Sequence, residues 1–475
     1  MSLSAALSTA TSGLSSLQTQ SAILSGNVSN AQNADYSRRY ATLTTQAVNG
    51  LPMAGRVSSI LRVSDSMLSQ SYYSSVSGLG LADAQLANMN KLAGLLGASE
   101  SSSDQTALGQ ALSQFEQAWK DLEATPESAD LKAQVINRGK QMLSEIARLA
   151  AQENSLRLAS QDSIQSGLTG INDAAARIAS LNSQIVAQQN AGQSVADLQD
   201  LRDAELAKIA AQTDIKVLVD DRGAMSVYSA NGVQIVAGTQ AQTFRYDADS
   251  NTILNAGPGN GGSDVTAGLA GGALQGQLDF LDTSAAALAS SDPNRAGLAK
   301  MMNQLDALAQ NIMDVVNAAY DDPDTADAEV FFEVDPTAPA DARIASSLIV
   351  AATADDLLTG RAGAVQQAMA TTQITADASN PASAPNGLRL SSTTLSGLVS
   401  GILSYHARAA SEATTDQAAA SSLKSTVEIK LQDTKGVDID TELAQLQLLQ
   451  NNYAALANVL NSIISMYDEL MSIGR

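Results

Sequence analysis

Few side chains in this sequence could do acid–base, nucleophilic or metal chemistry. There is no cysteine and one histidine, His406, so thiol nucleophiles, disulfides, Cys-ligated metals and multi-histidine zinc sites are excluded. A serine triad would need His406 as its base, and no G-x-S-x-G motif is present. Because His406 lies in the helical pattern of 402–410, it is predicted to be a helix-surface residue.

Gly257, Gly259 and Gly262 match the G-x-G-x-x-G spacing of a dinucleotide-phosphate loop. That loop requires a preceding strand and a helix that begins at the last glycine. Pro258 and the polar residues after Gly262 favour an ordinary loop over 255–262. No P-loop motif is present either, so the sequence predicts no cofactor.

Two acidic groups have the spacing of oxygen ligands. Asp438, Asp440 and Glu442 lie two residues apart, but the glycine and the distant glutamate of an EF-hand are missing. Helix capping explains them more simply, with Asp440 or Thr441 as N-cap and Glu442 in the first turn. Four aspartates within 321–327 predict an acidic exposed loop, with a weak surface cation site as the alternative. No metal site is predicted.

The chain is acidic, with 27 Lys+Arg and 49 Asp+Glu in 475 residues, a net charge of −22 and a pI of about 4.3. Nucleic acid and anionic membrane surfaces are disfavoured as partners, because binding to them depends on clustered Lys and Arg. The 44% hydrophobic content excludes a disordered chain, and no run of eighteen apolar residues predicts a membrane span. No Arg or Lys precedes Arg38, so no cleaved secretory signal is expected.

Each end of the chain carries a heptad pattern, with steps of three and four between apolar residues. The back faces are Ser, Thr, Gln, Asn and Ala, and no charge lies between Glu442 and Asp468. Helices of this kind suit a site where several pack side by side; a single globular bundle is the alternative. The residues expected at this interface are Leu3, Leu7, Leu14, Leu17, Leu24, Val28, Leu446, Leu449, Tyr453, Leu456, Leu460, Ile463, Tyr467 and Leu470.

The middle of the chain reads as long helices with one β-rich insertion. Helical spacing runs from Phe115 and Trp119 to a hairpin turn at 190–192, with a return helix over 195–212. From Asp214 the period changes to two, and helical spacing resumes after the loop 255–262. The predicted fold class is mainly α with a β-rich insertion.

Both ends resemble bacterial flagellar rod, hook and junction proteins, a family of axial proteins. The N-terminal signature of that family, S-G-L…Q…N-I-[SA]-N…G-Y-[ST]-R-Q, is similar to Ser12-Gly13-Leu14, Gln18, Asn27-Val28-Ser29-Asn30, Tyr36-Ser37-Arg38. The junction members end in G-V-[ND]-[LI]-D-x-E…L…Q…Y-x-A, which is similar to Gly436-Val437-Asp438-Ile439-Asp440-Thr441-Glu442, Leu446, Gln450, Tyr453. Two residues depart from the family pattern, because Asp35 stands where Gly is usual and Arg39 where Gln is usual.

The resemblance extends less specifically to the middle of the chain. Gly271-Gly272, Leu274, Gly276, Leu278 and Leu281 are similar to a G-G-x-L-x-G-x-L-D-F segment of the junction members, and a Phe331-Phe332 pair follows. These features separate the junction members from hook and rod proteins.

The resemblance implies an elongated multidomain rod whose N- and C-terminal helices pair as a coiled coil. The expected division is listed in chain order: 1–60, an axial segment that pairs with 436–475; 61–212, helical; 213–275, the β-rich insertion; 276–435, helical with exposed loops at 321–340 and 376–387; and 436–475, the C-terminal coiled-coil segment.

By the same resemblance the chain is a structural subunit of the junction between hook and filament, not an enzyme. The implied partners are further copies of itself in a ring, hook protein, the second hook-associated junction protein, an export chaperone and the type III export apparatus. The implied location is extracellular, in the flagellum. Another axial protein of the family is the nearer alternative, and a secreted enzyme or effector the more distant one.

Overall fold

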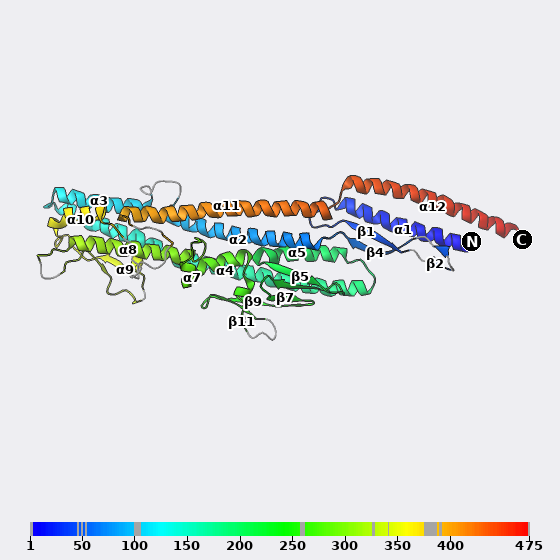
Figure 1. Cartoon of the computed structure of the whole chain (residues 1–475), viewed down its shortest axis with the longest axis horizontal. Coiled ribbons are helices and arrows are strands. Elements are labelled where there is room, and N and C mark those ends of the chain that lie inside the picture. The colour runs from blue at the N-terminus through cyan, green and yellow to red at the C-terminus, as the bar shows by residue number, and fades with distance from the viewer. Residues whose placement is uncertain are drawn as a thin grey trace.

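The computed structural model describes residues 3–44, 47–48, 51–52, 55–98, 106–256, 262–324, 328–340, 342–374, 387–388 and 392–473. The molecule is elongated, and most helices run along its length (Figure 1). Both chain termini lie at the same end, so the chain runs out along the rod and returns.

The end that holds the termini contains two long helices and a small β-hairpin unit. Its elements are α1 (Leu3–Ser29), β1 (Arg39–Thr44), β2 (Ala47–Val48), β3 (Leu51–Pro52), β4 (Arg56–Arg62) and α12 (Ile439–Ile473). The helices α1 and α12 pack against each other and run in opposite directions (Figure 1). Strands β1 and β4 pair antiparallel, from Arg39 opposite Arg62 to Thr44 opposite Arg56, and pack on α1. The sequence pattern did not predict these strands.

The rest of the rod is a bundle of helices. These are α2 (Ser66–Leu96), α3 (Ala107–Ala124), α4 (Ala129–Asn190), α5 (Ala196–Gln212), α6 (Gly272–Leu281), α7 (Ala285–Leu288), α8 (Gly297–Tyr320), α9 (Ile344–Ser347), α10 (Ala362–Thr371) and α11 (Leu395–Lys435), with 3-10 turns at Ala267–Leu269 and Thr359–Arg361. With 62 residues, α4 spans about 93 Å. Helices α2 and α11 lie side by side through the middle of the molecule (Figure 1).

Local sequence signals set many of the helix ends. Asp65, Thr106, Ser128 and Thr394 each accept a hydrogen bond from the backbone N–H three residues ahead, which caps α2, α3, α4 and α11. The predicted hairpin turn after α4 is present, and Gly192 adopts the left-handed φ of +70° that this turn requires.

The β-rich insertion consists of two small antiparallel sheets on one side of α4. Their strands are β5 (Ile215–Val219), β6 (Met225–Ser229), β7 (Gln234–Ala237) and β8 (Gln240–Ala241) in the first sheet, and β9 (Phe244–Asp247), β10 (Thr252–Asn255) and β11 (Ser263–Asp264) in the second. Asn182 of α4 bonds the N–H and C=O of Met225, and Asn172 does the same to Phe244. These paired amide contacts dock both sheets on the long helix.

An aromatic cluster forms the core at the end of the rod far from the termini. Phe115, Trp119, Tyr320, Phe331 and Phe332 are all buried, and the centroids of neighbouring rings lie 4.7–6.2 Å apart. The exposed loop expected over 321–340 is therefore only partly correct. Its Phe331 and Phe332 enter the core, where β12 (Phe332–Val334) pairs with β13 (Leu348–Val350). Burial of these two phenylalanine side chains offsets the cost of ordering the loop.

The predicted fold class, mainly α with a β-rich insertion, is confirmed. Helix α6 begins at Gly272, slightly inside the range expected for the insertion. Gly257, Gly259 and nearly all of the predicted loop 376–387 lie outside the described residues. None of the helices in the described ranges combines the length and apolar character that a bilayer span requires.

The sequence predicted His406 on a helix surface, and this prediction is wrong. This histidine is 1% exposed between α11 and α8, and its Nε2 lies 2.8 Å from Oε1 of Gln304. The prediction failed because α11 is packed on more than one side, so its polar positions do not all face water.

Candidate functional site

The packed pair of terminal helices contains most of the seam residues predicted from the heptads. Leu24 and Ile463 are buried at 7% and 6% exposure. The half-buried members are Leu3, Leu7, Leu14, Leu17, Val28, Leu446, Leu449, Leu456 and Leu460. Tyr453, Tyr467 and Leu470 are instead exposed, at 41%, 50% and 60%. In the single chain the pair therefore leaves part of its predicted seam open to water.

Helix α12 also exposes apolar side chains beyond that seam. These are Leu443, Leu448, Val459, Ile464, Met466 and Met471. With Tyr453, Tyr467 and Leu470 they form what we call the open face of α12. Seven of these nine side chains lie between Glu442 and Asp468, a stretch without a charged residue, and Leu470 and Met471 follow Asp468 and Glu469. Exposed apolar side chains in this number on one helix are typical of an interaction site.

A polar cluster lies at the base of the helix pair, where the chain enters and leaves the body of the rod. Asn27 is completely buried, and both ends of its amide are used. Its Oδ1 accepts from the Tyr36 hydroxyl at 2.9 Å and from the Arg39 N–H at 3.0 Å. Its Nδ2 donates to the Arg39 carbonyl at 2.9 Å and to Oε2 of Glu442 at 2.9 Å. One side chain thus contacts the segment after α1, the first strand and α12.

Glu442 completes this cluster from the first turn of α12. It is 0% exposed, and its Oε1 accepts from Nε of Arg38 at 2.5 Å. The capping role predicted for Asp440 or Thr441 belongs instead to Asp438, which accepts from the N–H of both residues. Glu442 is therefore a buried ion-pair partner rather than only a first-turn acid. The sequence did not indicate this partnership, because the two charges are 404 residues apart.

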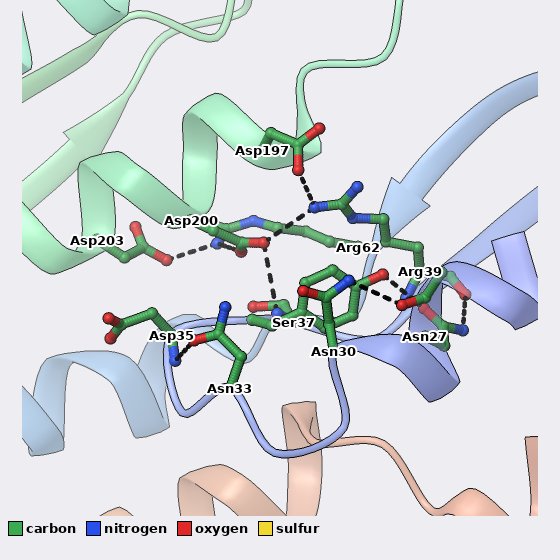
Figure 2. A network of polar contacts seen from close by, with 12 residues as sticks. Asn27, Asn30, Asn33, Asp35, Ser37, Arg39, Arg62, Asp197, Asp200 and Asp203 are labelled. Atoms are coloured by element: carbon green, nitrogen blue, oxygen red, sulfur yellow. Dashed lines mark hydrogen bonds and ion pairs between the residues drawn. The ribbon is translucent and has the colours of Figure 1, made fainter.

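A second set of charges joins the terminal end to the body. Figure 2 shows Arg39 and Arg62 directed toward three aspartates at the start of α5. Arg62 donates to Asp200 at 2.9 Å and to Asp203 at 2.6 Å, while Arg39 pairs with Asp197 and lies 3.5 Å from Asp200. Burial lowers the pKa of the Arg62 guanidinium, but the Asp203 and Asp200 carboxylates outweigh it, so the pKa is raised overall.

The two departures from the family signature have a structural account. Asp35 needs no left-handed backbone, since Asn251 and Ala296 are the non-glycine residues with positive φ in the described part of the chain. Its N–H instead donates to Asn33 in an Asx turn. Arg39 supplies a cation to Asp197 and Asp200 and stacks 4.6 Å from the Tyr36 ring centroid.

The structure brings some of the family-motif residues together and not others. Asn27, Tyr36, Arg38 and Glu442 meet in the polar cluster. The remaining members lie outside it: Ser12, Gly13 and Leu14 in α1, Asn30 just after α1 and bonded to the Gly26 carbonyl of that helix, Gly436 at the end of α11, and the exposed Asp440 and Gln450. A Cβ at Gly436 would lie 2.4 Å from the Gln432 carbonyl oxygen, which explains glycine there.

Comparison with known protein families gives a match for the central part of the chain. Residues 96–327, just under half of the chain, match the model described as the flagellar hook-associated protein FlgK helical domain. The central part of this chain is a FlgK-type helical domain. The match confirms the resemblance of the two ends to the junction members of the axial family, of which flagellar hook-associated protein 1 is one, on residues that those ends do not include. By this match the chain is related, over its central part, to structural proteins of the flagellar hook-associated kind.

A solved structure is also similar, the flagellar hook junction protein FlgK from Burkholderia pseudomallei, with 19% sequence identity and a TM-score of 0.46. The similarity covers 56% of this chain and 46% of that one, so it spans less than half of the length of that protein. No curated protein matches the chain.

Proposed function

We propose that the chain is a subunit of the junction between the flagellar hook and filament, and that it assembles through α1 and α12. The observation that carries this proposal is the open face of α12. Nine apolar side chains lie at 41–66% exposure on a helix without a charge between Glu442 and Asp468. A surface of this kind is typical of a site that neighbouring helices cover.

The division of the chain into terminal and central parts supports the same role. The helix pair and the β1–β4 hairpin form one end of the rod, while the FlgK-type helical domain lies in the body. In the proposed assembly, copies of the chain form a ring through their terminal ends. Hook protein and the second junction protein would contact the two sides of that ring, after export of the chain to the cell exterior with the help of a chaperone.

The proposal is tested by placing a charge in the seam. In Leu456→Asp or Leu460→Asp the carboxylate must stay charged without a partner or take up a proton, and either costs several kcal/mol per site. Both leucines are half-buried, and every subunit of a ring would repeat the defect. We expect cells that carry either variant to make hooks, to shed flagellin and to lose motility.

Ser462→Asp is the matched control, because Ser462 is exposed on the same helix and its substitution costs no more than about 1 kcal/mol in helix propensity. It should retain motility, and circular dichroism of the three purified variants should show the same helical content. Filaments of wild-type number from the two seam variants would contradict assembly through the α1–α12 pair.

A further inference from the structure

The seam between α1 and α12 offers little to fix how far one helix lies along the other. If α1 shifts along α12 by seven residues, most seam positions of α12 are taken over by another apolar residue. Leu456 replaces Leu449, for example, and Leu470 replaces Ile463. Helix α1 carries no charged residue, and α12 carries none between Glu442 and Asp468. Hydrophobic burial alone therefore favours several registers almost equally.

The connections at the base of the pair leave α1 as the helix that can shift. Three residues, 436–438, join α11 to α12, so α12 is held close to the end of α11. The longer irregular segment 30–38 joins α1 to β1. Helix α12 has 35 residues and α1 has 27, so α1 could move outward by a heptad and still remain on its partner.

We propose that Asn27 is the residue that sets the register of α1 on α12. It bonds both the N–H and the C=O of Arg39, which fixes the end of α1 along the first strand. It also donates to Glu442, which fixes α1 along α12. In any shifted register this completely buried amide would lie against apolar side chains with its hydrogen bonds unmade, and Glu442 would lose a donor.

The chemistry resembles the single buried asparagine that specifies register in a coiled coil at a cost in stability. Here the asparagine acts at one end of the seam rather than inside it. It is a positioning residue, because it acts on the placement of both helices and not on a ligand. The inference concerns the single chain and does not depend on the proposed role in the flagellum.

Cysteine cross-linking can read the register directly, since the chain has no cysteine of its own. Leu24 and Gln445 line one cavity of about 300 Å³ between α1, β1 and α12, so Leu24→Cys with Gln445→Cys reports the native register. Leu24→Cys with Asn452→Cys reports a shift of one heptad. The full-length chain would be kept dilute, in ammonium sulfate, which favours burial of apolar surface. It would then be treated with a bismaleimide whose two reactive groups are closer together than the roughly 10 Å that a heptad spans.

In the wild-type background we expect the native pair to cross-link at least tenfold more than the shifted pair. Asn27→Leu should bring the two yields within about threefold of each other. Asn30→Leu is the matched control, because Asn30 lies three residues further on, just beyond the end of α1, and its side-chain amide donates to the Gly26 carbonyl of α1 rather than to β1 or α12. It should leave the tenfold preference unchanged.

Three results would overturn the proposal. A tenfold preference that survives Asn27→Leu would mean that packing alone selects the register. Loss of both cross-links in Asn27→Leu would mean that Asn27 holds the helices together without choosing their register. Absence of the native cross-link in the wild-type background would mean that no such register exists in the free chain. None of these results bears on assembly, which the motility assay tests separately.

Discussion

Single residues account for much of what the sequence could not predict. His406 and Glu442 are the clearest cases, because each looked like an ordinary helix residue and each is buried against a partner far along the chain. Periodicity reports which positions are apolar, but it does not report which polar positions meet a partner across the fold. The motif residues Asn27, Tyr36 and Arg38 could be singled out from the sequence, whereas their convergence on Glu442 could not.

Burial of His406 makes stability depend on pH in a predictable direction. Desolvation lowers its pKa from 6.5 to about 3, so the folded chain keeps it neutral. The unfolded chain binds a proton below about pH 6.5, so the contribution of this residue is lost as pH falls from there toward 3. Between pH 7 and pH 5 the loss amounts to about 2 kcal/mol in the free energy of unfolding.

Denaturant unfolding at the two pH values measures this effect. Carboxylates also titrate in acid, so the comparison is with His406→Gln, which keeps a polar amide opposite Gln304. The pH-dependent loss should be about 2 kcal/mol smaller in the variant. Equal losses in both proteins would show that His406 is accessible to protons in the folded chain.

At the scale of elements, local patterns predicted long helices and the insertion well. The heptads of α12, the turn at Gly192 and the change of period at Asp214 depend on neighbouring residues alone, and each corresponds to an element boundary or face in the structure. The β1–β4 hairpin was missed because its alternation is weak and half of its side chains face water. Phe331 and Phe332 were missed as core residues because their partners, Phe115 and Trp119, are distant in sequence.

Close helix packing gives a prediction for two glycines of α2. A Cβ at Gly80 would lie 2.1 Å from the Ala211 carbonyl oxygen at the end of α5, whereas nothing lies within 4 Å of one at Gly78. Gly80→Ala should lower the free energy of unfolding by about 2–3 kcal/mol, because backbone must move to make room. Gly78→Ala should raise it by up to about 1 kcal/mol through helix propensity. Thermal unfolding followed by circular dichroism would separate them, and equal effects would mean that α2 does not approach α5 this closely.

At the scale of the whole molecule, the contacts that join the terminal end to the body are mainly ionic at α5. Arg39 and Arg62 come from β1 and β4, while Asp197, Asp200 and Asp203 come from the start of α5. Sequence alone could not pair these charges, because at least 138 residues separate the partners and the chain has 49 acidic residues to choose from. These ion pairs lie at the boundary between the terminal end and the body, where the rod would bend if the two parts moved relative to each other.

We expect Asp200 to fix the angle between the terminal end and the body. Its carboxylate is 9% exposed, lies 2.9 Å from Arg62 and 3.5 Å from Arg39, and accepts from the Ser37 N–H at 3.4 Å. Asp200→Asn removes the charge that both arginines share, in a site where water replaces it poorly. Spin labels on Gln447→Cys and Gln184→Cys, exposed sites in α12 and α4, should then give a broader distance distribution.

Asp197→Asn is the control for this experiment. Asp197 also pairs with Arg39, but its side chain is 81% exposed, and an exposed ion pair contributes less than about 1 kcal/mol. The distance distribution should therefore stay narrow in Asp197→Asn and broaden in Asp200→Asn. Raising the salt concentration should change the distance distribution of Asp197→Asn little. The partly buried Asp200 pairs remain in this variant, and salt screens them less than it screens surface charges. If Asp200→Asn lowers stability but leaves the distribution narrow, apolar contacts between the hairpin and α2 or α5 set the angle, and the aspartate only stabilises a geometry that they define.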